Sequence, residues 1–272
     1  MKKRILFIGL GIAGIVYACA TNPFTGKSTL ALVPDSQILP SAFQQYDSFL
    51  KENKVVTGTA DAQRVTTVGT KIKNAAERWL NANGYAGYLK DYKWEYKLVD
   101  SKEVNAWCMP GGKIVFYTGI LPITKDEAGM AVVMGHEVSH ALLNHGQQRM
   151  SSDVLTQLGA VGVGAAVSGK SETTQAIAMQ AYGVGAQYGV ALPFSRSHES
   201  EADRVGLTLM AIAGYDPTVS VAFWERMAAK SGGQAPPEFM STHPSDATRI
   251  ANLKALIPEA KAEAAKFGVK FK

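Results

Sequence analysis

The chain has 272 residues, of which 46% are hydrophobic and 19% charged, so it is long enough to bury a core and too apolar for a disordered protein. Its formal net charge is +5, and without Lys2, Lys3 and Arg4 at the amino terminus the net charge is +2. This balance excludes the basic surface of a nucleic-acid-binding protein, and two cysteines are too few for a disulfide scaffold.

The amino terminus has the pattern of a secretory signal peptide. The three basic residues precede an uncharged, mostly apolar stretch, residues 5–18, which is shorter than the roughly 17–25 residues of a membrane-spanning helix. Residues 16–19 resemble a bacterial lipobox with Cys19 as the lipid-modified residue, while ordinary cleavage within 18–20 and an uncleaved anchor are the alternatives. We therefore predict a lipoprotein signal peptide over residues 1–18 and membrane attachment through lipidated Cys19.

The first half of the chain predicts helices followed by a small sheet. Residues 19–38 are rich in Pro, Gly, Thr and Ser and predict a tether, which leaves residues 39–272 as one domain. Apolar residues at three- and four-residue spacing predict a helix after Asp61 that ends at Asn83. A helix over 41–52 precedes it, and short strands over 92–98, 104–109 and 113–118 predict a small antiparallel sheet.

The second half is predicted to be helical. Residues 124–127 form a capping box for a helix that runs to about Met150. The Gly- and Ala-rich residues 158–169 indicate close helix packing, because they are too few for a membrane span. Further helices are predicted from near Ser197 to Gly214, after Asp216-Pro217, and from Pro244 to Leu256.

The strongest chemical signal is the sequence His136-Glu137-Val138-Ser139-His140, an H-E-x-x-H motif. Positions four apart on a helix differ by about 40° in direction, so His136 and His140 project from one face and can bind the same metal ion. Glu137 is left free beside them to accept a proton from water. Apolar neighbours favour a functional role, because burying these three side chains without partners is costly. A pair of hydrogen-bonded core histidines is the structural alternative.

A zinc site needs a third protein ligand. Glu199 is the best candidate, because Glu199 and Asp203 lie four residues apart on one face of a predicted helix. We predict that Glu199 binds the metal and that Asp203 accepts a hydrogen bond from a ligating histidine, His136. Glu201 is the rival ligand, but it points about 200° away around the helix. A solvated acidic helix face is the alternative for all three acids.

Three histidines remain outside the motif. His145 is about 140° from the metal-binding face if the helix continues, and is predicted at the surface or behind the ligands. His198 is adjacent to Glu199 and points elsewhere. His243 lies in a Ser-Thr-His-Pro loop that could reach the metal from outside, although a loop histidine is more often solvated.

These motifs together resemble the HtpX/CAAX-prenyl-protease family of zinc metallopeptidases, and most closely its periplasmic and lipoprotein members. Besides the H-E-x-x-H motif, residues 22–26, 105–114, 195–203 and 242–249 carry the resemblance. It implies an α+β, zincin-like (gluzincin) fold in which a small antiparallel sheet packs beside the H-E-x-x-H helix. It also implies an edge strand at 113–117, near the active-site cleft.

The resemblance further implies the roles of the site residues. His136, His140 and Glu199 would bind one Zn²⁺ per chain, and Glu137 would be the catalytic base. His243 would lie near the metal, where it either blocks or assists catalysis.

Zinc-dependent hydrolysis of peptide bonds is therefore the predicted function. The predicted substrates are unfolded or misfolded proteins, bound as an extended strand along residues 113–117. The resemblance implies degradation of misfolded or unassembled proteins in the bacterial cell envelope, by a protein lipid-anchored at the periplasmic face of the outer membrane. One alternative is a lipoprotein chaperone or assembly factor with a silent or structural zinc site. Another is a different metal-assisted hydrolase.

Overall fold

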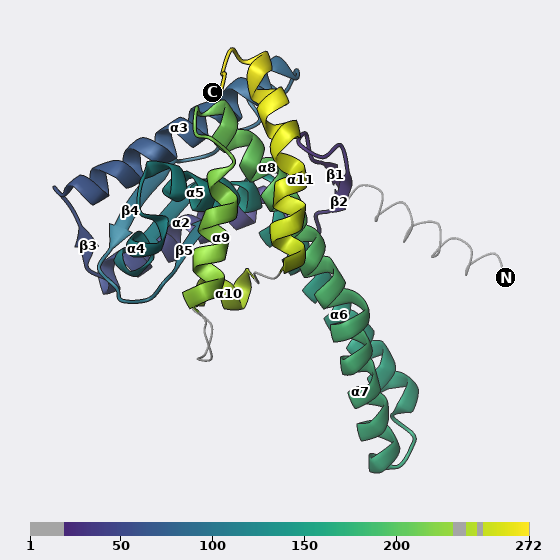
Figure 1. The fold of residues 1–272 in the computed structure, drawn as a ribbon. Coiled ribbons are helices and arrows are strands. Elements are labelled where there is room, and N and C mark those ends of the chain that lie inside the picture. Colours follow the sequence, from purple (N-terminus) through teal and green to yellow (C-terminus); the bar gives the residue numbers. More distant parts are fainter. Residues whose placement is uncertain (1–18, 231–237, 244–246, 272) are drawn as a thin grey trace. The chain divides into compact units, whose positions relative to one another are not determined.

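The computed structural model describes residues 19–230, 238–243 and 247–271. The predicted signal peptide, residues 1–18, lies outside the described residues, so its prediction stays open. Contacts divide the chain into two compact units (Figure 1). The first unit contains residues 19–38 and 144–198, and the second contains residues 39–143 and the described residues from 199 onward.

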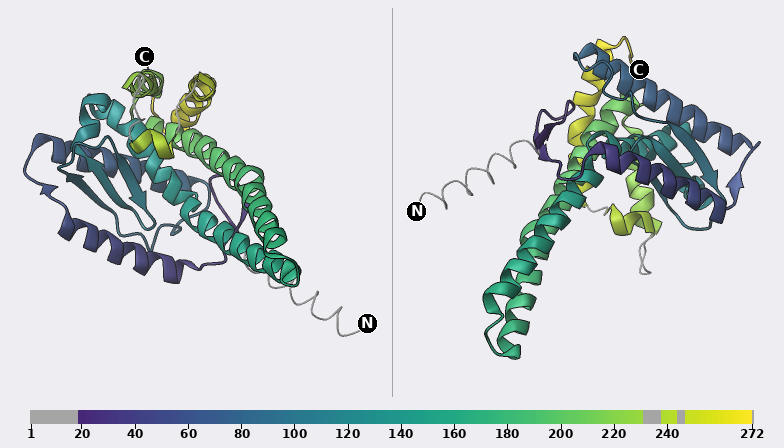
Figure 2. Two further views of the ribbon diagram at one scale, coloured as in Figure 1. Left: turned by 90° about the horizontal axis from the view of Figure 1, so that it is seen from below. Right: turned by 180° about the vertical axis from the view of Figure 1, so that it is seen from behind.

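The second unit contains a four-stranded sheet with the strand order β3-β4-β6-β5 (Figure 2). The strands are β3 (Val55–Val56), β4 (Glu95–Val99), β5 (Ala106–Met109) and β6 (Lys113–Tyr117). The β3–β4 and β5–β6 pairs are antiparallel, whereas β4 and β6 are parallel. The sequence predicted an antiparallel sheet, and the parallel β4–β6 pair departs from that prediction. The β5–β6 hairpin adds to the sheet through its second strand, which places β6 beside β4 in the same direction.

The prediction that residues 113–117 form an edge strand is wrong. β6 lies between β4 and β5, and all five of its residues are buried. After Lys113, its continuous apolar run, residues 114–117, is typical of a strand covered on both faces. The motif at residues 105–114 located the β5–β6 hairpin correctly. The sequence does not indicate which strand of this hairpin pairs with the rest of the sheet. The edge strands of the described sheet are β3 and β5.

Helices cover both faces of this sheet. Val115 and Tyr117 of β6 pack with Tyr46 of α2 (Asp35–Glu52). Ile114 and Phe116 point to the opposite face because side chains alternate along a strand. Helix α3 (Ala60–Ala82) contacts β4, and α5 (Glu127–Leu142) contacts both α3 and β5. The predicted α+β, zincin-like class, with a small sheet beside the H-E-x-x-H helix, is confirmed.

The rest of the second unit is helical. Besides α2, α3 and α5, this unit contains a 3-10 turn (Thr118–Ile120), α4 (Leu121–Thr124), α8 (Leu192–Ile212, in this unit from residue 199), α9 (Val219–Lys230), α10 (Glu238–Thr242) and α11 (Ala247–Lys266). Helix α9 contacts α4, α5 and α11. Helix α11 continues past its predicted end at Leu256, and its predicted start at residues 244–246 lies outside the described residues.

The single helix predicted from Thr124 to about Met150 is two helices. Helix α5 begins after Asp126, whose carboxylate accepts a hydrogen bond from the Gly129 N–H at 2.9 Å, so Asp126 is the N-cap. Helix α6 (His145–Val167) begins after Asn144, whose φ of 57° lies in the left-handed region. Asparagine adopts this conformation more readily than most residues, and this explains a break that hydrophobic spacing did not indicate.

The first unit consists of a short hairpin and two long helices. Strands β1 (Cys19–Thr21) and β2 (Ser28–Leu30) pair within the segment predicted as a tether. Helices α6 and α7 (Glu172–Ala186) lie side by side in both figures, and a π-helical turn (Gln187–Ala191) leads into α8. The Gln147 side chain donates a hydrogen bond to the Val33 carbonyl at 2.8 Å, which fastens the N-terminal segment to α6. Within the described ranges, none of the helices has the length and apolar character needed to cross a membrane.

Candidate metal centre

The two motif histidines project together from α5, as their spacing predicts. His136 is 2% exposed, and its Nε2 atom lies 3.1 Å from Nε2 of His140. Helix α5 is buried along most of its length, because it packs on the sheet, on α3 and on α9. The two imidazoles are therefore held by a well-packed helix rather than by a loop.

Glu199 of α8 and His243 complete a group of four side chains. Glu199 Oε2 lies 3.3 Å from His136 Nε2, and Glu199 Oε1 lies 3.3 Å from His140 Nε2. His243 Nδ1 lies 3.0 Å from His136 Nε2 and 2.9 Å from Glu199 Oε2. The four ligand atoms all lie within 4.8 Å of one another. The rival acid, Glu201, is not part of this group.

The spacing of these atoms fits a tetrahedral metal ion. Zinc bonds nitrogen and oxygen at about 2.0–2.2 Å, so the corners of its tetrahedron lie about 3.3 Å apart. The measured separations from His136 Nε2, between 3.0 and 3.3 Å, match this value. Burial raises the cost of leaving Glu199 charged, but hydrogen bonds from the neighbouring histidines outweigh it and hold its pKa well below the usual range. The group can therefore hold a cation through an ionised carboxylate.

Asp203 supports His136 from the side opposite the ligand group. Its Oδ1 atom lies 3.0 Å from His136 Nδ1, which agrees with the hydrogen bond predicted from the sequence. A carboxylate in this position fixes the tautomer that leaves Nε2 free for a metal. Burial would raise the pKa of Asp203, but the charge of Arg249 and the hydrogen bond with His136 lower it.

Arg249 of α11 is a site residue to which the sequence assigned no role. It donates to both oxygens of Asp203, at 2.8 and 2.7 Å, and its Nη1 lies 3.3 Å from Glu199 Oε2. Its guanidinium carbon lies 3.7 Å from the ring centroid of Trp224 in α9. A usable signal existed, because Arg249 stands four residues before the buried Leu253 and so shares the buried face of a predicted helix.

Glu137 is buried beside the ligand group. It is 4% exposed, and its Oε1 atom makes no hydrogen bond with the residues that the structure describes. Nε2 of His243 lies 3.3 Å from this oxygen. Burial raises the pKa of the Glu137 carboxyl, and nearby His243 only partly offsets this effect. An unsatisfied carboxylate oxygen at this position is suited to accept a proton.

His145 and His198 do not join the ligand group. Their rings stack at 3.9 Å in the first unit, and both are buried. His145 was predicted at the surface or behind the ligands, and its burial rules out the surface alternative. The prediction assumed a continuous helix, whereas α5 ends at Leu142 and a new helix begins at His145.

Two glycines let the ligand-bearing helices meet. A Cβ atom at Gly135 of α5 would lie 2.7 Å from the Gly206 carbonyl oxygen of α8. A Cβ at Gly206 would lie 2.9 Å from the backbone of Gly135 and His136. Helix α5 carries His136 and α8 carries Glu199, so this close crossing brings the ligands together.

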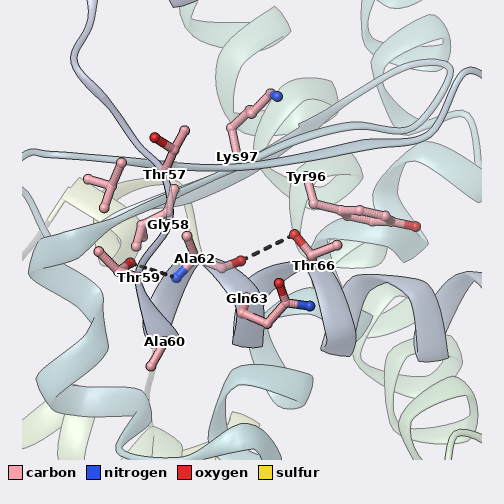
Figure 3. Close-up of a pocket in the computed structure, with 11 residues that line it drawn as sticks. Thr57, Gly58, Thr59, Ala60, Ala62, Gln63, Thr66, Tyr96 and Lys97 are labelled. Carbon is pink, nitrogen blue, oxygen red and sulfur yellow. Dashed lines mark hydrogen bonds between the residues drawn. The ribbon is translucent and has the colours of Figure 1, made fainter.

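A separate hollow of about 460 Å³ lies at the start of α3, and its lining includes none of the ligand residues (Figure 3). Thr59 accepts a hydrogen bond from the Ala62 N–H, and Thr66 donates one to the Ala62 carbonyl. These hydroxyl groups already serve the helix, so we assign no ligand to this hollow.

Comparisons with known proteins agree with this geometry. Residues 70–257 match the family model "Peptidase family M48". The chain is 30% identical to the mitochondrial metalloendopeptidase OMA1 of Bos taurus over 95% of this chain and 51% of that protein. It is 34% identical to that of Schizosaccharomyces pombe, over 63% and 49%. It is 29% identical to the β-barrel assembly-enhancing protease of Escherichia coli, over 58% and 33%. The chain spans about half the length of its mitochondrial relatives. At the level of the family, the predicted class of metalloendopeptidase is confirmed.

The comparisons overturn the predicted cellular role. A protease of the bacterial cell envelope, lipid-anchored at the outer membrane, was predicted from the amino terminus and the family resemblance. The relatives that match up to 95% of the chain are mitochondrial metalloendopeptidases, so this function and location are wrong. The alternative of a lipoprotein chaperone is not supported by these relatives either. The lipid anchor was inferred from residues 1–19, which lie outside the family match over residues 70–257.

Proposed function

Because the chain belongs to peptidase family M48, we propose that it is a zinc-dependent endopeptidase. The observation that carries this proposal is the group of four ligand atoms, all within 4.8 Å of one another, beside Glu137. In the proposed site, His136, His140 and Glu199 bind one zinc ion and Asp203 orients His136. The finer resemblance to the HtpX/CAAX-prenyl-protease type forms part of the same proposal.

Glu137 is the proposed general base. Zinc held by the three ligands would lower the pKa of the attacking water and polarise the scissile carbonyl. Glu137 takes the proton of the attacking water and returns it to the leaving amine. Burial suits the side chain to this role, because a carboxylate with a raised pKa accepts a proton more readily at neutral pH.

We propose that the substrate binds as an extended strand along β5. This strand forms one edge of the sheet and contacts α5, which carries His136 and His140. In this strand, burial and the charge of Glu137 raise the pKa of the Cys108 thiol. Strand addition recognises mainly the backbone, so unfolded segments of many sequences would bind. A proline beside the cleaved bond would slow cleavage, because it lacks the backbone N–H that a ladder requires.

His243 is the proposed fourth ligand of the resting site. Its Nδ1 atom lies 3.0 Å from His136 Nε2 and 2.9 Å from Glu199 Oε2, so it would hold the metal together with the other three ligands. A catalytic zinc site keeps one position open for water, so His243 would have to move away before a substrate is cleaved.

Metal content and proteolysis of the full-length chain test the proposal together. The purified protein should contain one zinc ion per chain and should cleave unfolded casein. A chelator should abolish cleavage, and added zinc should restore it. Cleavage that survives complete metal removal would contradict the proposal. So would zinc-loaded protein that remains inactive after the His243→Ala substitution.

A further inference from the structure

Exposed apolar side chains are concentrated on one part of the first unit, residues 152–192, which we call the helical arm. The arm contains most of α6, all of α7 and the turn that leads into α8. Twelve large apolar side chains are exposed among the described residues, and ten of them lie on the arm. These ten are Val154, Leu155, Leu158, Val161, Ile177, Met179, Val184, Tyr188, Val190 and Leu192.

The helical arm has no core of its own. No residue from 152 to 197 is buried. The two helices are joined by a hydrogen bond from the Tyr182 hydroxyl to the Thr156 carbonyl at 2.7 Å, and Gly159 leaves room for the Tyr182 ring. Most of the stability of a helix in water comes from packing an apolar face. The apolar faces of the arm therefore require a partner.

The charges on the helical arm indicate what kind of partner this is. Only Asp153, Lys170 and Glu172 are charged, and the last two lie at the turn between α6 and α7. Insertion of the turn into a bilayer would bury Lys170 and Glu172 in hydrocarbon, which costs several kcal/mol for each charge. A helix lying on a membrane surface normally has a face rich in Lys and Arg, which the arm does not have. The two helices are uncharged over residues 154–169 and 173–192, and the turn between them is charged. This distribution is suited to a helical bundle in which the charged turn remains in water.

We propose that two copies of this chain associate through their helical arms and form a four-helix bundle. The ten side chains expose on the order of 800 Å², taking about 150 Å² for a fully exposed side chain of this size. This is about the area that each partner buries in a standard stable interface. In a two-fold symmetric dimer, the helical arm of each copy would contact the helical arm of the other.

Sedimentation of the full-length chain tests the proposal. Leu158 and Val161 are 63% and 71% exposed and lie three residues apart on one helix face. We expect the parent protein to be a dimer at micromolar concentration. We expect L158E combined with V161E to raise the dimer dissociation constant at least tenfold. The matched control is Tyr85→Glu, which adds a charge at a 43% exposed apolar residue of the second unit and should leave the dimer intact.

A cross-linking experiment keeps the test decisive if the charged variant loses helix content. Val161→Cys in a Cys19→Ser background should give a covalent dimer with a short bismaleimide, while the background alone should not. The proposal is overturned by a monomeric parent, by a dimer that survives both charges, or by equal cross-linking of a Tyr85→Cys control. It is also overturned if the monomeric parent floats with phosphatidylcholine vesicles and the doubly charged variant does not, since lipid would then be the partner.

Discussion

Glu137 is a buried carboxyl group whose pKa lies above its usual range, because burial disfavours the charged form. The side chain accepts a proton only when it is ionised, so activity should be lost as the pH falls through the raised pKa. We expect the acidic limb of kcat/KM to lie above the ordinary glutamate pKa of about 4.3. A pH–rate profile on an unfolded peptide measures this limb. A limb at or below the ordinary value would argue against Glu137 as the base.

Asp203 orients a metal ligand rather than binding the metal itself. In Asp203→Asn, the charge that holds Arg249 and His136 is lost, and zinc affinity should fall by about 10–100-fold. Competition with a chelator measures the change. Asp216→Asn is the matched control, because Asp216 also has a lowered pKa but pairs with Lys261 at 3.0 Å, outside the ligand group. Equal losses of affinity in the two variants would contradict this role for Asp203.

His243 lies where a fourth ligand would exclude water, so removing its ring should open the site. We expect His243→Ala to increase the initial rate of casein cleavage severalfold at saturating zinc. A lower rate would mean that the imidazole stabilises the oxyanion during the reaction. Either a lower or an unchanged rate would contradict His243 as a resting ligand.

Some residues of the site could be placed from the sequence, and others could not. The direction of His136 and His140 follows from helix geometry, and the four-residue spacing of Glu199 and Asp203 places them on one face. The structure brings all four together. For His243, the residues alone predicted a loop that could reach the metal, and only the family resemblance placed it near the metal, because its position depends on the five-residue helix α10 that it follows. Arg249 had no assigned role, because its partners lie on helices distant in sequence.

At the scale of elements, the site depends on how closely α5 and α8 cross. Gly135 and Gly206 stand at the crossing, where either Cβ atom would come within 3 Å of the other helix's backbone. Helical spacing predicted both helices, but it contains no information about which of their faces would meet. An interior glycine next to the metal-binding motif was the available signal, since such a glycine often marks close packing.

Gly206→Ala should therefore separate the two ligand-bearing helices. We expect overpacking to destabilise the fold by about 1–3 kcal/mol and to weaken zinc binding. Thermal unfolding and chelator competition measure the two effects. Gly162→Ala is the matched control, because a Cβ there meets no atom within 4 Å, and it should stabilise its helix by about 0.5–1 kcal/mol. If Gly206→Ala behaves like this control, the crossing does not position the ligands.

The strands show where local sequence patterns stop being informative. Alternation and the Pro-Gly-Gly turn located β4, β5 and β6 to within a few residues. The order of the strands was not predictable from these patterns, because β6 pairs directly with β4, although β5 lies between them in the sequence. This order moves the edge of the sheet from residues 113–117 to β5, and with it the proposed substrate position.

At the scale of the whole molecule, the chain has two compact units, and residues 39–143 and those from 199 onward contain the complete ligand group. The sequence predicted one domain over residues 39–272. That prediction could not anticipate a first unit built from segments far apart in the chain. The family relationship and the site are consistent with each other, because residues 70–257 include every proposed ligand.

The most direct test of the account compares the full-length, zinc-loaded protein with its Glu137→Gln variant on unfolded casein. Glutamine keeps the shape of the side chain but cannot accept the proton of water, so we expect zinc binding to be retained. The cleavage rate should fall by about 10²–10⁴-fold. Equal cleavage by the two proteins would show that Glu137 is not the base and would contradict the proposed mechanism.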